Sequence, residues 1–177
     1  LFSIIEIGPG EGTLSRDLIA AISGIAPSLI SKIELILVEL NVGMRKRQEN
    51  VVNDLEGINC RWSSIEDLIL SPVTGVVIAN EVLDAFPVER LVFSNNMVFR
   101  QGVALKKINN EYFLEFIDLK PTSEIINFLQ ESSSLLNIEF PPKHICNRWI
   151  TEWHCDVPSW FGKLSKGLIN GSLLIVD

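Results

Sequence analysis

Long apolar runs are missing from this sequence, and so is an excess of basic residues. No apolar run approaches the roughly 18 residues that a helix needs to cross a bilayer, so we do not expect membrane insertion. Lys and Arg number 15 against 22 Asp and Glu, which gives a formal net charge of −7. Because a surface this acidic does not attract phosphate backbones, nucleic acid is not expected as the main partner.

Cysteine is scarce as well. Cys60, Cys146 and Cys155 cannot form a closed set of disulfides, which favours a reducing compartment: the cytoplasm of a bacterium, or an organellar matrix if the source is eukaryotic. His144 and His154 lie near two of these cysteines, but the closely spaced cysteine pair of a zinc site is missing. We therefore predict no metal site.

The composition itself is that of a globular domain. Of 177 residues, 47% are apolar and 21% are charged, which is enough for one domain with a sizeable core. Residues 1–5 and 172–177 both have the pattern of core strands. Because a core strand needs neighbours and a loop by which to leave, we expect the sequence to be the middle part of a longer protein.

Strand-like and helix-like segments alternate along much of the chain. We expect strands over residues 3–7, 32–40, 57–62, 75–80 and 172–177, and helices over residues 14–23, 41–55, 64–70 and 153–168, the last interrupted at Pro158. The first helix should bury Leu14 and Leu18, and Thr13 should cap it; Asn41 should cap the second. Segment 32–40 is almost continuously apolar, which is typical of a strand covered on both faces. The alternation predicts an α/β fold with a mostly parallel, Rossmann-like sheet and helices on both faces.

Residues of about 91–119 interrupt this alternation. Strand-like segments at 91–99 and 111–118, a third at 103–108 and a turn at Asn109 and Asn110 predict a β-ribbon inserted after the fourth strand. A helix over 122–136 should follow, and Trp149 and Trp153, spaced i, i+4, should pack a helix onto the core. We therefore treat residues 1–177 as one partial domain that carries this ribbon.

A glycine-rich turn after the first strand is the most informative segment. It has the sequence Glu6-Ile7-Gly8-Pro9-Gly10-Glu11-Gly12. Alternate glycines allow a tight turn and the close approach of a ligand to the backbone. The dinucleotide pattern G-x-G-x-x-G is not matched, and Glu6 and Glu11 would repel a pyrophosphate.

This charge pattern suits a cationic ligand that also carries an amino group. S-adenosyl-L-methionine is such a ligand, and we predict that Glu6, Gly8, Pro9, Gly10 and Gly12 hold its methionine part. The alternative is that the glycines only reverse the direction of the chain.

Two further strand ends supply candidate cofactor-binding residues. Glu39 closes the second strand, where an acid can accept both hydroxyls of a ribose; alternatively it is a surface acid near the start of the next helix. After the third strand, Ile65 could cover an adenine ring and Ser64 could meet its edge. The other interpretation, which does not exclude the first, is that Ser63 or Ser64 caps a helix.

Three polar residues follow the fourth strand. If the chain turns helical there, Glu81 shares a face with Asp84, and so does Asn80. We predict that Asn80, Glu81 and Asp84 are catalytic residues that align the methyl acceptor, and that Asn80 also touches the cofactor. Carboxylates at this edge could hold a guanidinium by paired hydrogen bonds. The alternative is a capped helix with solvated acids.

Residues 6–14, EIGPGEGTL, together with residues 80–90, NEVLDAFPVER, resemble one family. It is the MidA-like methyltransferases, which are related to the mitochondrial complex I assembly-factor arginine methyltransferase. The glycine turn marks any class I methyltransferase, whereas N-E-x-x-D-A-x-P-V-E-R is much more specific. The segment from Glu39 to Gln48 and the last strand also look like this family.

The resemblance implies a class I fold that depends on S-adenosyl-L-methionine, with Gly8, Gly10 and Gly12 around the methionine part and Glu39 on the ribose. It also implies a protein acceptor, with arginine as the methylated residue. Members of the family carry an additional N-terminal region, and more sheet follows their fifth strand.

We therefore predict an S-adenosyl-L-methionine-dependent methyltransferase that acts on a protein; the sequence does not predict its oligomeric state. Two other hypotheses remain. One is a non-catalytic assembly or scaffolding factor for a respiratory-type complex, which would bind the cofactor without turnover. The other is a nucleotide-dependent oxidoreductase, which NADH rather than S-adenosyl-L-methionine would protect against heat.

Overall fold

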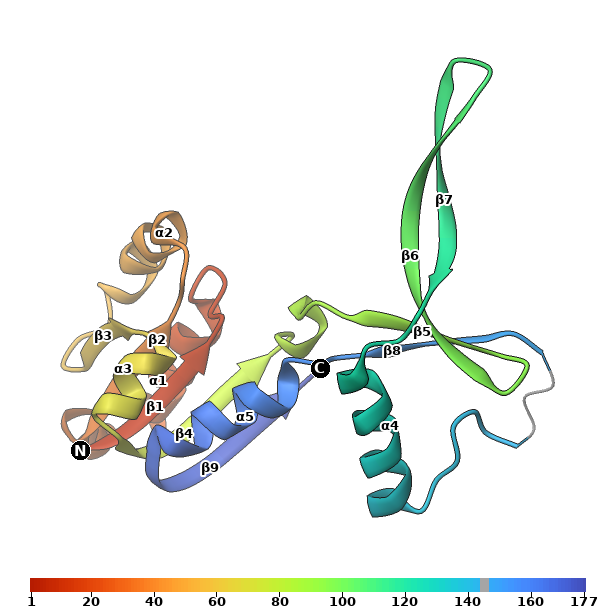
Figure 1. Ribbon diagram of the computed structural model, residues 1–177. Coiled ribbons are helices and arrows are strands. Elements are labelled where there is room, and N and C mark those ends of the chain that lie inside the picture. Colours follow the sequence, from red (N-terminus) through yellow and green to blue (C-terminus); the bar gives the residue numbers. More distant parts are fainter. Residues whose placement is uncertain (144–146) are drawn as a thin grey trace. The chain divides into compact units, whose positions relative to one another are not determined.

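The computed structural model describes residues 1–143 and 147–177, so His144 and Cys146, considered above as metal ligands, lie outside the described residues. The chain divides into two compact units. The first comprises Leu1–Phe86 and Asp156–Asp177, and the second comprises Pro87–Cys155 (Figure 1). Each unit is described by itself below.

The first unit is built on a five-stranded sheet in which every neighbouring pair is parallel. Its strands, in the order β3-β2-β1-β4-β9, are Asn59–Ser63, Ile33–Val38, Phe2–Ile7, Val73–Asn80 and Leu168–Val176. The chain runs outward from β1 to β3 and then returns to β4 on the other side of β1. Ligands in open parallel sheets bind at such a reversal, beyond the carboxyl ends of the strands.

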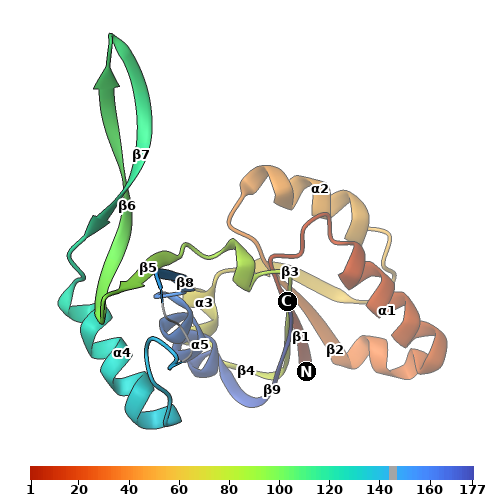
Figure 2. The same cartoon turned by 90° about the vertical axis from the view of Figure 1, so that its right-hand side faces the viewer.

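Helices cover both faces of this sheet, as Figure 2 shows. They are α1 (Thr13–Ile25), α2 (Val42–Val52), α3 (Ile65–Leu70) and α5 (Val157–Lys166), with the short 3-10 segments η1 (Pro27–Lys32) and η2 (Leu83–Ala85). The predicted α/β class, with a parallel sheet between helices, is confirmed.

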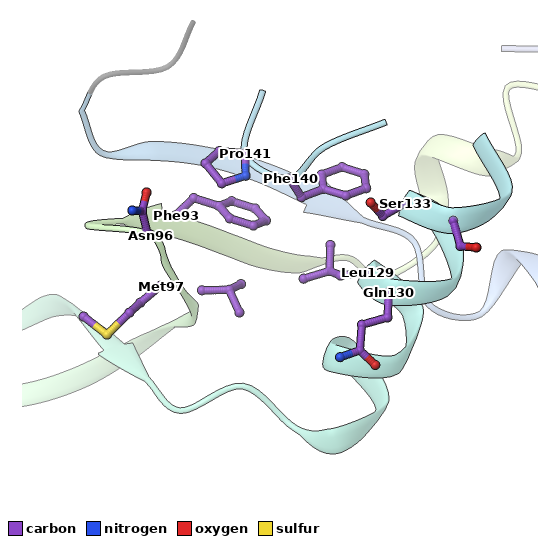
Figure 3. Close-up of a pocket in the computed structure, with 10 residues that line it drawn as sticks. Phe93, Asn96, Met97, Leu129, Gln130, Ser133, Phe140 and Pro141 are labelled. Carbon is purple, nitrogen blue, oxygen red and sulfur yellow. The ribbon is translucent and has the colours of Figure 1, made fainter. Parts of the chain in front are cut away.

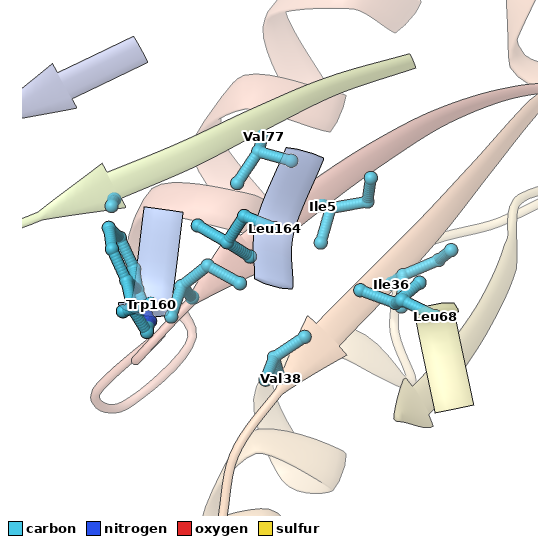
Figure 4. Packing of buried hydrophobic residues seen from close by; sticks show 9 residues of the cluster. Ile5, Ile36, Val38, Leu68, Val77, Trp160 and Leu164 are labelled. Carbon is cyan, nitrogen blue, oxygen red and sulfur yellow. The ribbon is translucent and has the colours of Figure 1, made fainter. Parts of the chain in front are cut away.

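Two apolar clusters explain the almost continuously apolar β2. Leu35 and Leu37 pack with Ile19 of α1 and Val52 of α2 on one face of the sheet. Ile36 and Val38 pack on the other face with Leu68 of α3 and with Trp160 and Leu164 of α5 (Figure 4). Successive side chains of a strand point to opposite faces of the sheet. Odd and even positions must therefore both be apolar when helices cover both faces.

The second unit has a four-stranded antiparallel sheet and, among its described residues, one helix. Its elements are β5 (Glu89–Ser94), β6 (Met97–Ile108), β7 (Glu111–Leu119), α4 (Ser123–Leu136) and β8 (Trp149–Trp153), and the strand order is β7-β6-β5-β8. Leu91 and Phe93 of β5, Ile125 of α4 and Trp153 form its buried cluster. The ribbon of β6 and β7 is thus part of a sheet with its own small core.

Two details of the predicted ribbon were wrong. The segment predicted as one strand over 91–99 contains a tight turn, because Asn95 and Asn96 have φ of 51° and 60°. The predicted third strand, 103–108, is the second half of β6. An Asn-Asn pair predicted the turn at Asn109 and Asn110, where φ is 49° and 66°. Asn95 and Asn96 form the same kind of pair, so this turn could have been predicted in the same way.

The helix expected around Trp149 and Trp153 is wrong as well, because this segment is strand β8, antiparallel to β5. The ring of Trp149 stacks on Phe93 at 5.2 Å and the ring of Trp153 stacks on Phe128 at 4.5 Å, both between centroids. A spacing of four is even, so it places two side chains on one face of a strand as well as of a helix. Helix α5 begins later, at Val157, with Pro158 in its first turn rather than interrupting it.

Within the described residues, none of the helices combines the length and the apolar character that crossing a bilayer requires.

Candidate functional site

The predicted site residues of the first unit gather at one edge of the parallel sheet. Register pairs Ile7 of β1 with Val38 of β2 and with Ala79 of β4, and pairs Val38 with Ser63 of β3. The glycine turn, Glu39 and Ser64 directly follow β1, β2 and β3, and Asn80 is the last residue of β4. The structure therefore brings the sequence candidates to the edge where ligands of such sheets bind.

The glycine turn needs its glycines. Gly8, Gly10 and Gly12 have φ of +62°, +54° and +85°. Residues that have a Cβ rarely adopt this left-handed conformation. The Gly8 N–H donates to the carbonyl of Val38 at 3.0 Å, which ties the turn to the end of β2. No described atom lies within 4 Å of the position that a Cβ of Gly10 would take, so the turn faces open space there.

Helix α1 starts one residue earlier than the predicted cap at Thr13 requires. Gly12 occupies the N-cap position without a side-chain acceptor, and Thr13 is the first helical residue. The fully buried residues of the helix are Ser15 and Ile19, and the predicted Leu18 packs partly buried against the same cluster as Ile19, whereas the predicted Leu14 is exposed. Ser15, a polar residue on this buried face, was not predicted as a residue of the site.

Ser15 lies against Glu6, and both are buried, at 1% and 4% exposed. The Ser15 hydroxyl donates to the Glu6 carboxylate. Burial raises the pKa of Glu6, and the hydrogen bonds from Ser15 partly oppose that rise. Glu6 is therefore a buried acid tied to the first turn of α1 through Ser15, nine residues away, and its role in binding the methionine part stays a prediction.

The raised pKa of Glu6 makes stability depend on pH in a definite direction. Above the unfolded value of 4.5, and up to the raised folded value, the native state keeps a proton that the unfolded state has lost. The contribution of Glu6 to stability therefore falls as pH rises through this window. We expect the unfolding free energy of Glu6→Gln, minus that of the wild type, to increase over the same window. Urea denaturation from about pH 4 to about pH 8 measures this difference, and a decrease would contradict the assignment.

Glu11, the other acid of the turn, also has a partner. Its carboxylate lies 3.0 Å from the guanidinium of Arg47 on α2, and both side chains are exposed. The guanidinium of Arg47 locally balances the negative charge of Glu11. Glu11 would therefore repel a pyrophosphate less strongly than we predicted from the sequence. Glu39 becomes the more important acid at this edge.

Glu39 is half-buried and its carboxylate is held on both oxygens. Oε1 accepts from the N–H of Asn41 at 2.7 Å, and Oε2 accepts from the side-chain amide of Gln48 at 3.1 Å. The same amide nitrogen of Gln48 donates to the carbonyl of Gly10 at 2.8 Å. Asn41 also caps α2 as predicted, accepting from Gly43 and Met44. Gln48 had no predicted role, because nothing near it in the sequence indicates these two distant partners.

Ser64 forms the helix cap that was one of its two interpretations. Its hydroxyl accepts from the N–H of Asp67 at 3.0 Å, and the Asp67 carboxylate accepts from the Ser64 N–H at 3.1 Å. The Ser64 hydroxyl also donates to the Asp67 carboxylate at 2.7 Å, and this hydrogen bond, together with the one from the Ser64 N–H, holds the pKa of Asp67 below its usual value. Ile65 packs against the cluster under α3 and α5. A role for Ser64 or Ile65 in binding adenine stays a prediction.

The segment after β4 is not an α-helix, so the predicted shared helical face of Asn80, Glu81 and Asp84 is wrong. Glu81 has φ of 52°, and only the three residues of η2 follow in helical form. A positive φ at Glu81 turns the chain before a helix can start. All three side chains are exposed. Their catalytic role is a separate matter and stays a prediction.

This segment is instead fixed by the end of the neighbouring strand. The Glu81 N–H donates to the carbonyl of Val176 at 2.8 Å, and the Asp177 carboxylate accepts from the N–H groups of Val82 and Leu83 at 3.0 and 2.6 Å. Val82 also lies 3.4 Å from where a Cβ of Gly8 would be. The loop after β4 therefore packs on the glycine turn, across the point where the strand order reverses.

A cavity of about 470 Å³ lies elsewhere, within the second unit (Figure 3). Phe93, Leu129 and Phe140 supply apolar walls, and Asn96, Gln130 and Ser133 are among its polar lining residues. None of its described lining residues is ionisable, so we assign no chemistry to it. Across residues 1–143 and 147–177, no group of three or more His, Cys, Asp or Glu residues is placed to hold a metal ion.

Comparison with known proteins adds a family and a fold. A family model described as "Putative S-adenosyl-L-methionine-dependent methyltransferase" matches residues 1–177. None of the curated proteins compared matches the chain.

Two solved structures from Burkholderia thailandensis are similar. One, named a "likely methyl transferase" and bound to S-adenosyl-homocysteine, shares 24% identity with a TM-score of 0.74, over 98% of this chain and 41% of its own. The other, named an "uncharacterized" superfamily protein, shares 22% identity with a TM-score of 0.68, over 95% of this chain and 41% of its own. At these identities the similarity shows the fold. The chain thus spans less than half the length of these structures.

Proposed function

Because the chain belongs to this methyltransferase family, we propose that it binds S-adenosyl-L-methionine at the carboxyl edge of its parallel sheet and transfers the methyl group to a protein, with arginine as the acceptor residue. The predicted family is confirmed by the match over residues 1–177. The transfer itself, the protein acceptor and the arginine specificity are our proposal.

One observation carries the proposal: a carboxylate stands in fixed geometry beside an open glycine turn. Glu39 at the end of β2 and Gly10 in the turn after β1 are tied to one another through the amide of Gln48. The turn lets a ligand approach the backbone, and the carboxylate is placed to accept hydrogen bonds from ribose hydroxyls. The similar structure from Burkholderia thailandensis that is bound to S-adenosyl-homocysteine supports this ligand.

Methyl transfer mainly requires that the acceptor be aligned with the methyl group of the cofactor. When bound, S-adenosyl-L-methionine supplies a methyl group on a positively charged sulfur. Glu81 and Asp84, exposed beside the turn, are proposed to receive a guanidinium by charge-assisted hydrogen bonds and to accept the proton that it loses. Asn80, the last residue of β4, is proposed to position the acceptor and touch the cofactor. The anchors on Val176 and Asp177 hold this loop against the turn, as alignment requires.

Calorimetric titration tests the cofactor. We expect S-adenosyl-homocysteine to give a saturable signal with a dissociation constant of about micromolar size, and NADH to give none. A signal from NADH alone, or from neither ligand, would contradict the proposal and, in the first case, favour an oxidoreductase.

Transfer is tested with methyl-labelled S-adenosyl-L-methionine and a cell extract. We expect one or more protein bands to take the label and acid hydrolysis to release methylated arginine. Label on another residue would refute the arginine assignment alone. Binding without any transfer would favour the non-catalytic assembly factor.

A further inference from the structure

Gln48 is a buried amide at the middle of the site. It lies on α2 with a side chain that is 0% exposed. Its Nε2 donates to the carbonyl of Gly10 at 2.8 Å and to Glu39 Oε2 at 3.1 Å, and its Oε1 accepts from the indole N–H of Trp62 at 2.8 Å. One side chain thus connects the glycine turn, the end of β2 and the strand β3.

The orientation of this amide follows from its partners. A carbonyl and a carboxylate can only accept, so the group that faces Gly10 and Glu39 must be the NH₂. The indole N–H of Trp62 can only donate, so the oxygen must face it. Both protons of the amide and one acceptor site of its oxygen are therefore in use. Glu and Met, which are close to Gln in size, would each lose both donors.

We propose that Gln48 is a positioning residue that sets the distance and orientation between the Gly10 backbone and the Glu39 carboxylate for S-adenosyl-L-methionine. This inference rests on the proposed function. Asn41 and Gln48 use one acceptor position on each oxygen of Glu39, so the carboxylate is immobilised while it retains acceptor positions for two hydroxyls. Gln48 touches no reacting atom in this account and acts through Glu39 and Gly10.

The first test compares binding of S-adenosyl-homocysteine by the wild type, Gln48→Glu and Gln48→Met. Gln48→Glu places a carboxylate against Glu39 and the Gly10 carbonyl, and Gln48→Met removes the donors without adding charge. We expect each to raise the dissociation constant at least about tenfold, because two donors are lost, one of them to an ionised group. Circular dichroism and thermal unfolding identify a variant that fails to fold, and the other then carries the test.

Asn50→Asp is the matched control. Asn50 lies on the same helix but is exposed, so this substitution makes the same change from amide to carboxylate away from the site. We expect it to change the dissociation constant by less than about twofold, since surface substitutions have small effects.

A double-mutant cycle with Glu39→Ala separates positioning from general support of the fold. If Gln48 acts through Glu39, Gln48→Met should weaken binding by a clearly smaller factor in the Glu39→Ala background than in the wild type. Equal factors in both backgrounds, or wild-type affinity in a folded Gln48→Met variant, would overturn the positioning role. Absence of binding by the wild type would instead refute the proposed function.

Discussion

Replacing Glu39 with alanine is expected to raise the dissociation constant for S-adenosyl-homocysteine about a hundredfold, or about 3 kcal/mol, through the loss of two hydrogen bonds to a charged acceptor. The carboxylate follows β2 directly and is held by the Asn41 N–H and the Gln48 amide. An acceptor that is already in position gains affinity because little freedom is lost when the ligand arrives. The exposed Asn41 N–H can bond to water instead, but one buried N–H of Gln48 loses its acceptor, so we also expect the unfolding free energy to fall by about 1 to 3 kcal/mol.

Two further variants make this expectation specific. Glu49→Ala removes the same kind of side chain from an exposed position on α2 and should leave binding unchanged within about twofold. Gly10→Val should weaken binding as strongly as Glu39→Ala, because it places a branched side chain at φ of +54° in the space in front of the turn. Wild-type affinity in Glu39→Ala, measured by calorimetry with the folded protein, would remove Glu39 from the site.

Replacing Gly75 with alanine is expected to produce the largest loss of stability. Gly75 is buried in β4 and pairs with Ser3 of β1. A Cβ at Gly75 would lie 1.8 Å from the carbonyl oxygen of Ser3, which is backbone and cannot rotate away. The two central strands would have to separate, so we expect a loss of about 3 kcal/mol and a decrease in Tm of roughly 10 °C.

The same substitution at Gly24 should have the opposite sign. Gly24 lies in α1, is exposed, and has no atom within 4 Å of its missing Cβ. Alanine is the better helix former by about 1 kcal/mol, so Gly24→Ala should raise the unfolding free energy. Urea denaturation measures both variants. A Gly75→Ala protein as stable as the wild type would mean that β1 and β4 do not approach as closely as described.

Local signals explain which parts of the site were predictable. Gly8, Gly10 and Gly12 were recognised because a turn that requires positive φ leaves its glycines in the sequence. Glu39 was recognised because it directly follows an apolar strand, and Asn41 because a cap is set by its own neighbours in sequence. The catalytic candidates after β4 were located, but the helix expected there was wrong because nothing local indicated the positive φ of Glu81.

The amino-acid pattern alone determined the α/β class, the parallel sheet and the position of the glycine turn, because each depends on the order of residue types along the chain. The family followed from the resemblance of residues 6–14 and 80–90. Tertiary structure decided the partners: Ser15 for Glu6, Gln48 for Gly10 and Glu39, and Asp177 for the loop after β4. These pairs join residues from 9 to 95 positions apart. These pairs form only when the strands align in register. Neither the periodicity nor the composition of the sequence indicates which distant polar groups this register brings together.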